Sequence, residues 1–273
     1  MTQIPLTSLT CPLDHLPLTR QGKCFTCPSG HSFDLAKRGY INLLPPQNKR
    51  SKDPGDSIEM IAARQRFLAA GHYQALANAL ADVSAVSESV TLLDAGCGEG
   101  YYLRQLERSA PLTHWLAAGL DISKPAIDTA AKLDKGFQYL VASNANIPLA
   151  KDSVDVLWCV FGFADFAQFS HVLKPSGRLI MVDPGPEHLR ELREIIYTDV
   201  VEKDTERTTP AGYDLADTLN IKGSMNLDNA SINDLLLMTP HLFRAKREGR
   251  EKASQLQHLT CQYDMQLRVL LPQ

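Results

Sequence analysis

The sequence predicts an α/β domain built on a mostly parallel sheet and preceded by a small cysteine-rich module. From residue 90 onward, strand patterns and helix patterns alternate over short connections, as in a parallel sheet with helices on both faces. A glycine cluster stands where the first of these strands turns into the first helix. Residues 1–46 are rich in Pro, Cys and Gly and show little helical periodicity, so something other than an apolar core must hold them together.

The sequence also predicts the individual helices and strands. A polar loop over 47–56 precedes a helix that begins at Ser57, with Asp56 and Glu59 placed as a capping box. A later helix begins at Ser123 and carries a proline in its first turn, where a missing N–H does no harm. The remaining strands are expected at 90–95, 115–120, 137–141, 154–161, 178–182 and 261–269, and the remaining helices at 73–83, 100–109, 166–173 and 187–200.

Composition and charge are those of a soluble globular protein with 44% hydrophobic and 22% charged residues. Residues 1–52 carry seven basic and two acidic side chains, a net charge of +5, whereas the other 21 basic and 29 acidic side chains give −8. A basic segment on an acidic body is typical of a module that approaches phosphate. A solvated surface without any partner would show the same charges.

The sequence shows no secretory signal, and its longest apolar run, 156–164, is too short to cross a membrane. We therefore expect a cytoplasmic protein without a membrane partner. In that compartment the six cysteines should be thiols or metal ligands rather than a disulfide framework.

The strongest motif is the segment 93–101, which reads Leu-Asp-Ala-Gly-Cys-Gly-Glu-Gly-Tyr. Its first two glycines can adopt backbone angles closed to other residues, which lets the main chain approach a ligand closely. Asp121, at the end of the next strand, can accept hydrogen bonds from the ribose hydroxyls of an adenosine cofactor. The residues of this region expected to contact the cofactor are Asp94, Gly96, Gly98, Asp121 and, at the adenine ring, Asn144.

The glycine spacing favours S-adenosylmethionine over a dinucleotide. It reads Gly-x-Gly-x-Gly rather than Gly-x-Gly-x-x-Gly, and Glu99 lies inside the turn. A carboxylate at a helix N-terminus repels a pyrophosphate, whereas S-adenosylmethionine carries a sulfonium and an ammonium and no phosphate. The alternative interpretation is a tight turn that binds nothing.

A candidate metal site near the N-terminus consists of Cys11, Cys24, Cys27 and His31. Thiolates and an imidazole at this spacing suit tetrahedral zinc, and metal binding would explain how a segment with little core folds. Asp14 stands where the second cysteine of a Cys-x-x-Cys pair would be expected. Zinc would therefore bind four of these five residues, the uncertain ligand being Asp14 or Cys24. The alternative is a set of reduced cysteines without metal.

Taken together, these motifs resemble the family of 23S ribosomal RNA guanine-N1 methyltransferases. The most specific segment is 27–45, Cys-Pro-x-x-His-x-Phe-Asp-x-Ala-Lys-x-Gly-Tyr-x-Asn-Leu-Leu-Pro. The other matching segments are 49–57, 70–73, 96–102, 184–189 and 238–240, so the likeness spans nearly the whole chain. The resemblance implies a Rossmann-like class I methyltransferase domain that uses S-adenosylmethionine to methylate N1 of a guanine in a hairpin loop of 23S ribosomal RNA. It also implies an N-terminal zinc module that helps to recognise the RNA, and a homodimer.

The resemblance sets the expected division of the chain. Residues 1–46 would form a zinc-binding RNA-recognition module, residues 47–85 a basic loop and helical linker, and residues 86–273 the methyltransferase domain. Further cofactor contacts implied by matching positions are Tyr73, Tyr102, Leu103 and His188.

One segment departs from the family pattern. Where the family tends to carry an aromatic-small-Pro sequence, residues 161–165 read Phe-Gly-Phe-Ala-Asp. N1 of guanine is buried in base pairs, so the target base must be unpaired or extruded, and Phe161 and Phe163 are candidates to stack on it. Asp165 is the candidate acceptor for the N1 proton. The basic side chains expected to contact phosphates are Lys37, Arg38, Lys49, Arg50 and Lys52.

Two rival functions stay open on sequence grounds. A small-molecule methyltransferase would share the glycine loop, and a non-catalytic or altered-specificity protein would bind S-adenosylmethionine and RNA without the same reaction. The basic N-terminal segment favours RNA over a small molecule.

Overall fold

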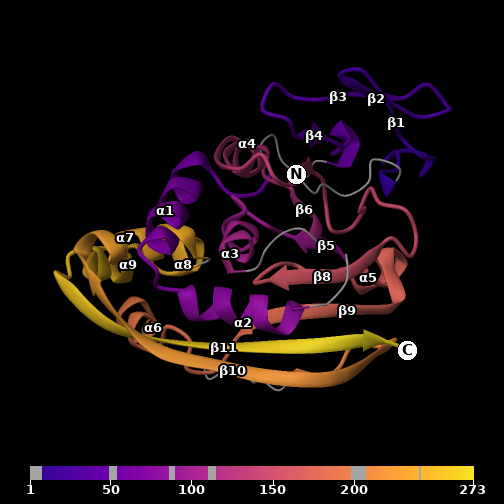
Figure 1. The fold of residues 1–273 in the computed structure, drawn as a ribbon. Helices are drawn as coiled ribbons and strands as arrows, with labels where there is room; N and C mark the ends of the chain where they lie inside the picture. Colours follow the sequence, from indigo (N-terminus) through magenta and orange to yellow (C-terminus); the bar gives the residue numbers. More distant parts are fainter. Residues whose placement is uncertain (1–7, 49–53, 86–89, 110–114, 198–206, 240) are drawn as a thin grey trace.

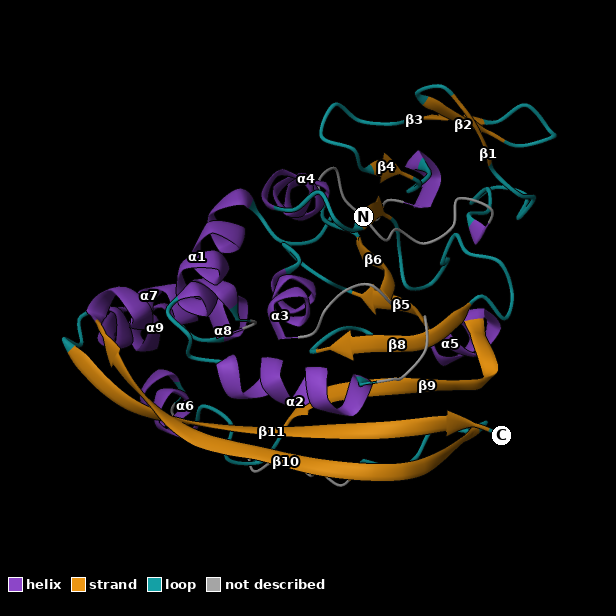
Figure 2. Cartoon of the chain, in the orientation of Figure 1, coloured by secondary structure: helices purple, strands orange, loops and turns teal. Residues whose placement is uncertain are grey.

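The computed structural model describes residues 8–48, 54–85, 90–109, 115–197, 207–239 and 241–273 (Figures 1 and 2). Its strands are β1 (Thr19–Gln21), β2 (Cys24–Thr26), β3 (Ser32–Asp34), β4 (Ile41–Asn42), β5 (Val90–Ala95), β6 (Trp115–Asp121), β7 (Gln138–Val141), β8 (Val154–Val160), β9 (Leu173–Pro184), β10 (Tyr213–Asp228) and β11 (His258–Pro272). Its helices are α1 (Ile58–Ala69), α2 (Gln74–Ser84), α3 (Tyr101–Ser109), α4 (Lys124–Leu133), α5 (Phe166–Val172), α6 (Arg190–Ile196), α7 (Asn229–Met238), α8 (His241–Arg244) and α9 (Arg247–Ser254), with a 3-10 turn at Pro46–Asn48.

Two sheets organise these elements. The small one is antiparallel with the order β1-β2-β3, and the large one has the order β10-β11-β9-β8-β5-β6-β7-β4. Neighbouring strands from β4 to β9 run parallel, whereas β11 lies antiparallel between β9 and β10. The predicted α/β fold with a mostly parallel sheet is therefore confirmed.

The central strands send successive side chains into two separate cores, as the period of a strand requires. Leu92 enters the core built with α1, α2, α3, α4, α6 and α7. Leu93 enters the core on the opposite face, which contains Phe169 of α5 and Phe25 of β2. The N-terminal ribbon, by which we mean residues 8–45, thus covers part of a sheet face that a doubly wound domain ordinarily covers with helices.

The N-terminal ribbon also extends the large sheet. Ile41 and Asn42 of β4 pair in parallel with Leu140 and Val141 of β7. Figure 1 shows the three short strands of the ribbon above this edge of the sheet, beside β4. The boundary expected at residue 46 therefore follows a strand that already belongs to the main sheet.

The observed capping residue matches the prediction for α4 but differs from it for α1. Ser123 caps α4, with its hydroxyl accepting the Ala126 N–H, as predicted. At α1 the cap is Ser57, whose hydroxyl accepts the Met60 N–H at 3.3 Å, so the capping role predicted for Asp56 is wrong. Asp56 lies one residue too early and instead forms an ion pair with Arg64 at 3.1 Å.

The C-terminal third contains elements that the sequence analysis missed: β10, α7, α8 and α9. The helix expected over 187–200 is described as Arg190–Ile196, and its last expected residues, 198–200, lie outside the described part of the chain. No helix within the described ranges is both long enough and apolar enough to span a bilayer.

Candidate functional site

The glycine loop, residues 96–100, connects the end of β5 to the start of α3 at the carboxyl edge of the parallel strands. Gly96, Gly98 and Gly100 have φ values of 97°, 55° and 76°, a region that favours glycine. A methyl group built on Gly96 would meet only the Cα of Gly162, at 3.8 Å, among the described atoms within 4 Å. The main chain at Gly96 is therefore open to close approach by a ligand.

Asp121, the last residue of β6, fixes this loop to the neighbouring strand. Its Oδ2 accepts the Gly98 N–H at 2.9 Å, and its Oδ1 accepts the Ser123 N–H at 2.8 Å. Burial raises the pKa of the Asp121 carboxyl, and these two N–H groups act in the opposite direction by stabilising the carboxylate. The arrangement leaves further lone pairs on both oxygens, as the expected ribose contact requires.

Asp94 adds a second carboxyl group at this end of β5. It is fully buried, and neither of its oxygens has a hydrogen-bond partner among the described residues. Burial raises the pKa of Asp94 to about 8, with a further contribution from the negative charges of Asp121 and Glu99. A cationic ligand would lower this pKa and favour the ionised carboxylate, which fits the sulfonium and ammonium of S-adenosylmethionine.

Asp94 also makes the stability of the ligand-free protein depend on pH. Because its pKa rises from 3.8 to about 8, the folded protein binds more protons than the unfolded chain between these values. The resulting stabilisation is complete below pH 3.8 and is lost as the pH rises through about 8. We expect Asp94→Asn, which cannot ionise, to gain stability relative to the wild type between about pH 6 and about pH 9. Urea denaturation at both pH values measures this, and a stability difference that does not change with pH would contradict it.

An aromatic cluster borders the loop. Tyr73, the residue before α2, is buried, and its Oη lies 3.4 Å from Nε2 of His188. The ring of Phe161 lies 6.3 Å from that of Tyr73 and 5.8 Å from that of His188. Burial lowers the pKa of His188 to about 4, so the imidazole is neutral. Its Nδ1 accepts the Asp264 N–H, which leaves the proton on Nε2 for donation to Tyr73.

The segment 161–165 lies directly against the glycine loop. A methyl group built on Gly162 would come within 3.2 Å of the Ala95 carbonyl oxygen. The Asn144 amide donates to the carbonyl oxygen of Phe163 at 2.8 Å, whereas its own buried Oδ1 has no partner among the described residues. The side chain of Phe163 is 93% exposed. Asn144 therefore connects the end of β7 with the segment where a target base is expected.

Two other residues expected to contact the cofactor have side chains that are partly or fully buried. The Leu103 side chain is fully buried in the core, so only its main chain can face the loop. Tyr102 is half-buried, and its ring lies 5.1 Å from that of Tyr101.

Two carboxylates have structural partners that the sequence did not reveal. Glu99 is buried and forms an ion pair with Arg104 at 2.5 Å, so its charge is compensated and gives little repulsion toward a phosphate. Asp165 caps α5, because its Oδ1 accepts the Gln168 N–H at 3.0 Å.

Four ligand atoms of the N-terminal ribbon lie within 4.8 Å of one another, from Cys11, Asp14, Cys27 and His31. The Nδ1 of His31 is 3.5 Å from the Cys11 sulfur, 3.4 Å from the Cys27 sulfur and 3.1 Å from Asp14 Oδ2. A tetrahedral zinc ion with bonds of about 2.0–2.3 Å separates its ligands by roughly 3.3–3.8 Å. The donor set and its spacing therefore fit zinc.

Cys24 is not part of this cluster. Its sulfur lies 2.7 Å from the hydroxyl of Ser32. Since successive residues of a strand point to opposite faces, the entry of Phe25 into the core turns Cys24 away from it. The structure thus gathers Asp14, and not Cys24, with the other three candidate ligands.

The basic residues expected to contact phosphate differ in exposure and in ion pairing. Lys37 is exposed, whereas Arg38 forms an ion pair with Asp128 of α4. Lys49, Arg50 and Lys52 lie outside the described residues.

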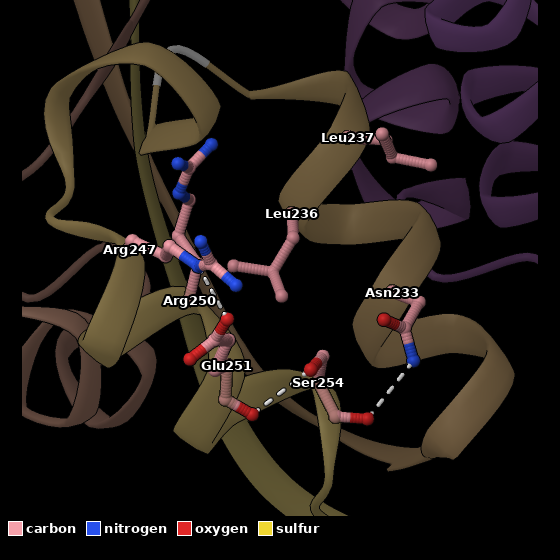
Figure 3. A pocket seen from close by; sticks show the side chains of 7 residues that line it. All are labelled: Asn233, Leu236, Leu237, Arg247, Arg250, Glu251 and Ser254. Atoms are coloured by element: carbon pink, nitrogen blue, oxygen red, sulfur yellow. Dashed lines mark hydrogen bonds and ion pairs between the residues drawn. The ribbon is translucent and has the colours of Figure 1, made fainter.

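A hollow between α7 and α9 is another candidate pocket (Figure 3). Two polar contacts lie within it: Arg247 Nε donates to Glu251 at 2.6 Å, and the Asn233 amide donates to the Ser254 carbonyl at 3.3 Å. None of the described residues that line it comes from the glycine loop. We therefore centre the site on the loop and not on this hollow.

The sequence analysis missed one residue at the loop, Arg64 of α1. A methyl group built on Gly98 would lie 3.8 Å from Cδ and 4.0 Å from Nε of Arg64. No local pattern marks this arginine, because 34 residues separate it from Gly98 and only the packing of α1 brings the two together.

Comparisons with known proteins agree with this geometry. Residues 9–52 match the family described as RlmA, N-terminal, and residues 93–181 match a methyltransferase domain family. A Bacillus subtilis protein named as a 23S rRNA (guanine-N(1)-)-methyltransferase is 30% identical over 260 residues, which cover 90% of each chain. A Micromonospora griseorubida protein with the same activity in its name is 39% identical over 208 residues, or 68% of this chain and 69% of its own length.

The fold also has a counterpart among solved structures. A chain from the Haloferax volcanii complex of the Trm112 methyltransferase activator with a methyltransferase superposes with a TM-score of 0.50. The match covers 80% of this chain and 98% of that chain at 20% identity, which shows a shared fold.

Proposed function

The chain belongs to the 23S ribosomal RNA (guanine-N1) methyltransferase family, and on that premise we propose that it transfers a methyl group from S-adenosylmethionine to N1 of a guanine in a hairpin loop of 23S ribosomal RNA. The observation that carries the proposal is the pairing of β4 with β7, which attaches the N-terminal ribbon and its metal-ligand cluster to the sheet that carries the glycine loop. A small-molecule methyltransferase has no need of such a ribbon.

S-adenosylmethionine, when bound, supplies an electrophilic methyl group on its sulfonium. In our proposal Asp121 and the main chain of Gly96 and Gly98 hold the ribose and the tail. Asp94, whose ionised form a bound cation would favour, contributes negative charge near them. The paired Tyr73 and His188 bound the site on the side of Phe161 and exclude water from it. The protein's main task is then to hold the guanine N1 in line with the methyl group.

Loss of the N1 proton needs an acceptor near the target base. We propose Asp165, through the carboxylate oxygen that does not cap α5. Asn144 supports the same segment through its hydrogen bond to Phe163, and we propose that its free Oδ1 meets the adenine amino group.

Phe163 is proposed to stack on the extruded base, because its exposed ring lies in the segment that abuts the glycine loop. We expect Phe163→Ala to lower kcat/KM for RNA about tenfold while leaving the affinity for S-adenosylhomocysteine unchanged, since stacking contributes about 1–3 kcal/mol per base. Methyl incorporation into ribosomal RNA and calorimetric titration measure the two effects.

Leu133→Ala is the matched control for Phe163→Ala, because Leu133 is another exposed apolar side chain but lies at the end of α4. It should change neither quantity. Equal rates for Phe163→Ala and the wild type would refute the stacking role.

The function itself is tested with labelled S-adenosylmethionine and ribosomal RNA from cells that lack the gene. We expect one methyl group per 23S molecule, mapped by mass spectrometry to N1 of a guanine. Methylation of a metabolite instead would support the small-molecule rival. Saturable binding of S-adenosylhomocysteine without any RNA methylation would support the non-catalytic or altered-specificity rival.

Zinc is proposed to be held by Cys11, Asp14, Cys27 and His31, where it would have a structural role because all four positions are taken by protein ligands. We retain the division into residues 1–46, 47–85 and 86–273 as functional parts. A cytoplasmic location follows from the proposed ribosomal substrate.

A homodimer is also proposed. The sheet ends in β10, an edge strand of 16 residues, and three exposed leucines lie on the β10–β11 hairpin: Leu215, Leu219 and Leu271. An unpaired edge with exposed apolar side chains is suited to association. Light scattering should give twice the mass of one chain.

A further inference from the structure

Arg64 is a half-buried arginine in the middle of α1 whose guanidinium lies over the glycine loop. Its Cδ and Nε are within 4.0 Å of the position that a side chain on Gly98 would occupy. Helix α1 is held in place by its packing on α7 and by the cap at Ser57. The position of Arg64 at the loop is therefore fixed by the fold.

The hydrogen bonds of Arg64 leave one side of the guanidinium without a partner. Nη2 donates to Asp56 Oδ2 at 3.1 Å and to the carbonyl oxygen of Met238 at 3.4 Å. Nε is buried and has no hydrogen-bond partner among the described residues. A buried N–H without a partner is costly, so this position is suited to an acceptor that arrives with a ligand.

The charges around the loop indicate which acceptor that is. Asp94 and Asp121 face the loop and favour the cationic groups and hydroxyls of the methyl donor. The donor has one anionic group, the carboxylate of its methionyl tail. Because this carboxylate would bind near two aspartates, a cationic side chain is needed to offset the repulsion. Arg104, another described arginine at the loop, is already bound to Glu99 at 2.5 Å.

We propose that Arg64 binds the methionyl carboxylate of S-adenosylmethionine through Nε and thereby sets the specificity for a donor with an intact amino-acid tail. The proposal rests on the proposed function, because it requires the glycine loop to bind this donor. A guanidinium is suited to the role, since it stays charged and donates in a fixed plane to a carboxylate. Asp56 acts on the opposite side of the group and orients it.

The test compares two ligands by calorimetry: S-adenosylhomocysteine, which has the amino-acid tail, and 5′-methylthioadenosine, which lacks it. We expect Arg64→Met to weaken binding of S-adenosylhomocysteine about ten- to a hundredfold and to leave binding of 5′-methylthioadenosine within about twofold. Arg64→Lys, which retains the charge and the helix, should give an intermediate loss confined to S-adenosylhomocysteine, and it serves as the test if Arg64→Met does not fold.

Two control variants separate binding from structure. Arg66→Met breaks another arginine–aspartate pair of α1, with Asp234, and should leave the ratio of the two affinities unchanged. Asp56→Asn removes the charge that orients Arg64 but keeps the guanidinium, so it should weaken binding of S-adenosylhomocysteine less than Arg64→Met does and leave binding of 5′-methylthioadenosine unchanged.

Other outcomes have distinct meanings. An equal loss for both ligands in the Arg64 variants, or no loss for either, would overturn the proposal, because Arg64 would then be structural or unused. If the wild-type protein binds neither ligand, the proposed function itself fails.

Discussion

Asp121→Ala is expected to weaken S-adenosylhomocysteine binding about a hundredfold, equivalent to about 2.8 kcal/mol. The Asp121 carboxylate accepts the N–H groups of Gly98 and Ser123, so its removal leaves two main-chain donors without their acceptor. The glycine loop would then lose its connection to the end of β6, in addition to the proposed ribose contact. Each charge-assisted hydrogen bond contributes about 1.5–3 kcal/mol, so the expected loss needs no more than two of these contacts.

Asp155→Ala is the matched control for this variant. Asp155 also accepts a main-chain N–H, that of Thr91 at 2.8 Å, and also sits on a parallel strand of the sheet. It lies at the start of β8, away from the carboxyl edge, so its loss should lower the thermal midpoint without changing ligand affinity. Calorimetric titration of the folded variants measures the difference. Equal affinities for Asp121→Ala and the wild type would contradict the role that we assign to this loop.

Cys27→Ser is expected to reduce bound zinc from about one equivalent per chain to nearly none and to lower the thermal midpoint by about 10 °C. The sulfur of Cys27 is one of four clustered ligand atoms, and a serine hydroxyl is a poor zinc ligand at neutral pH. Without the metal, the segments that carry Cys11 and Cys27 would lose the ion that joins them, which would loosen the packing of Phe25 in the core beneath the sheet. Elemental analysis and a thermal melt measure the two changes.

Cys24→Ser distinguishes the metal cluster from a general effect of cysteine loss. Cys24 belongs to the same small sheet, but its sulfur contacts Ser32 and not the cluster. The variant should retain zinc and a thermal midpoint close to that of the wild type. If Cys24→Ser loses zinc as completely as Cys27→Ser, our choice of ligands is wrong.

Much of the methyltransferase core could be predicted because its signals are local. Ser123 and the proline two residues later define the start of α4, and the mainly apolar composition of β5 and β8 marks strands that are buried on both faces. The position of Asp121 beside the glycine loop was also predictable, because the end of the strand after a glycine loop is a recurrent place for a carboxylate.

The remaining features depend on tertiary contacts that no short window contains. Strand β10 is mostly exposed and includes Gly223 and Lys222, so it lacks an apolar alternation and forms because β11 pairs with it along its length. Spacing alone could not decide between Asp14 and Cys24, since the decision depends on which face of β2 enters the core. The approach of Arg64 to Gly98 requires the packing of α1.

The pairing of β4 with β7 has a consequence for how such an enzyme can be divided. A chain that began after the ribbon would present the outer edge of β7, and the apolar surface around Leu140 and Leu149, to water. An unpaired strand edge can pair with the edge of another chain. We therefore expect the shortened chain to self-associate rather than to be active as a monomer. The N-terminal ribbon and the methyltransferase domain are thus expected to fold as one unit, so that neither would be stable when expressed alone.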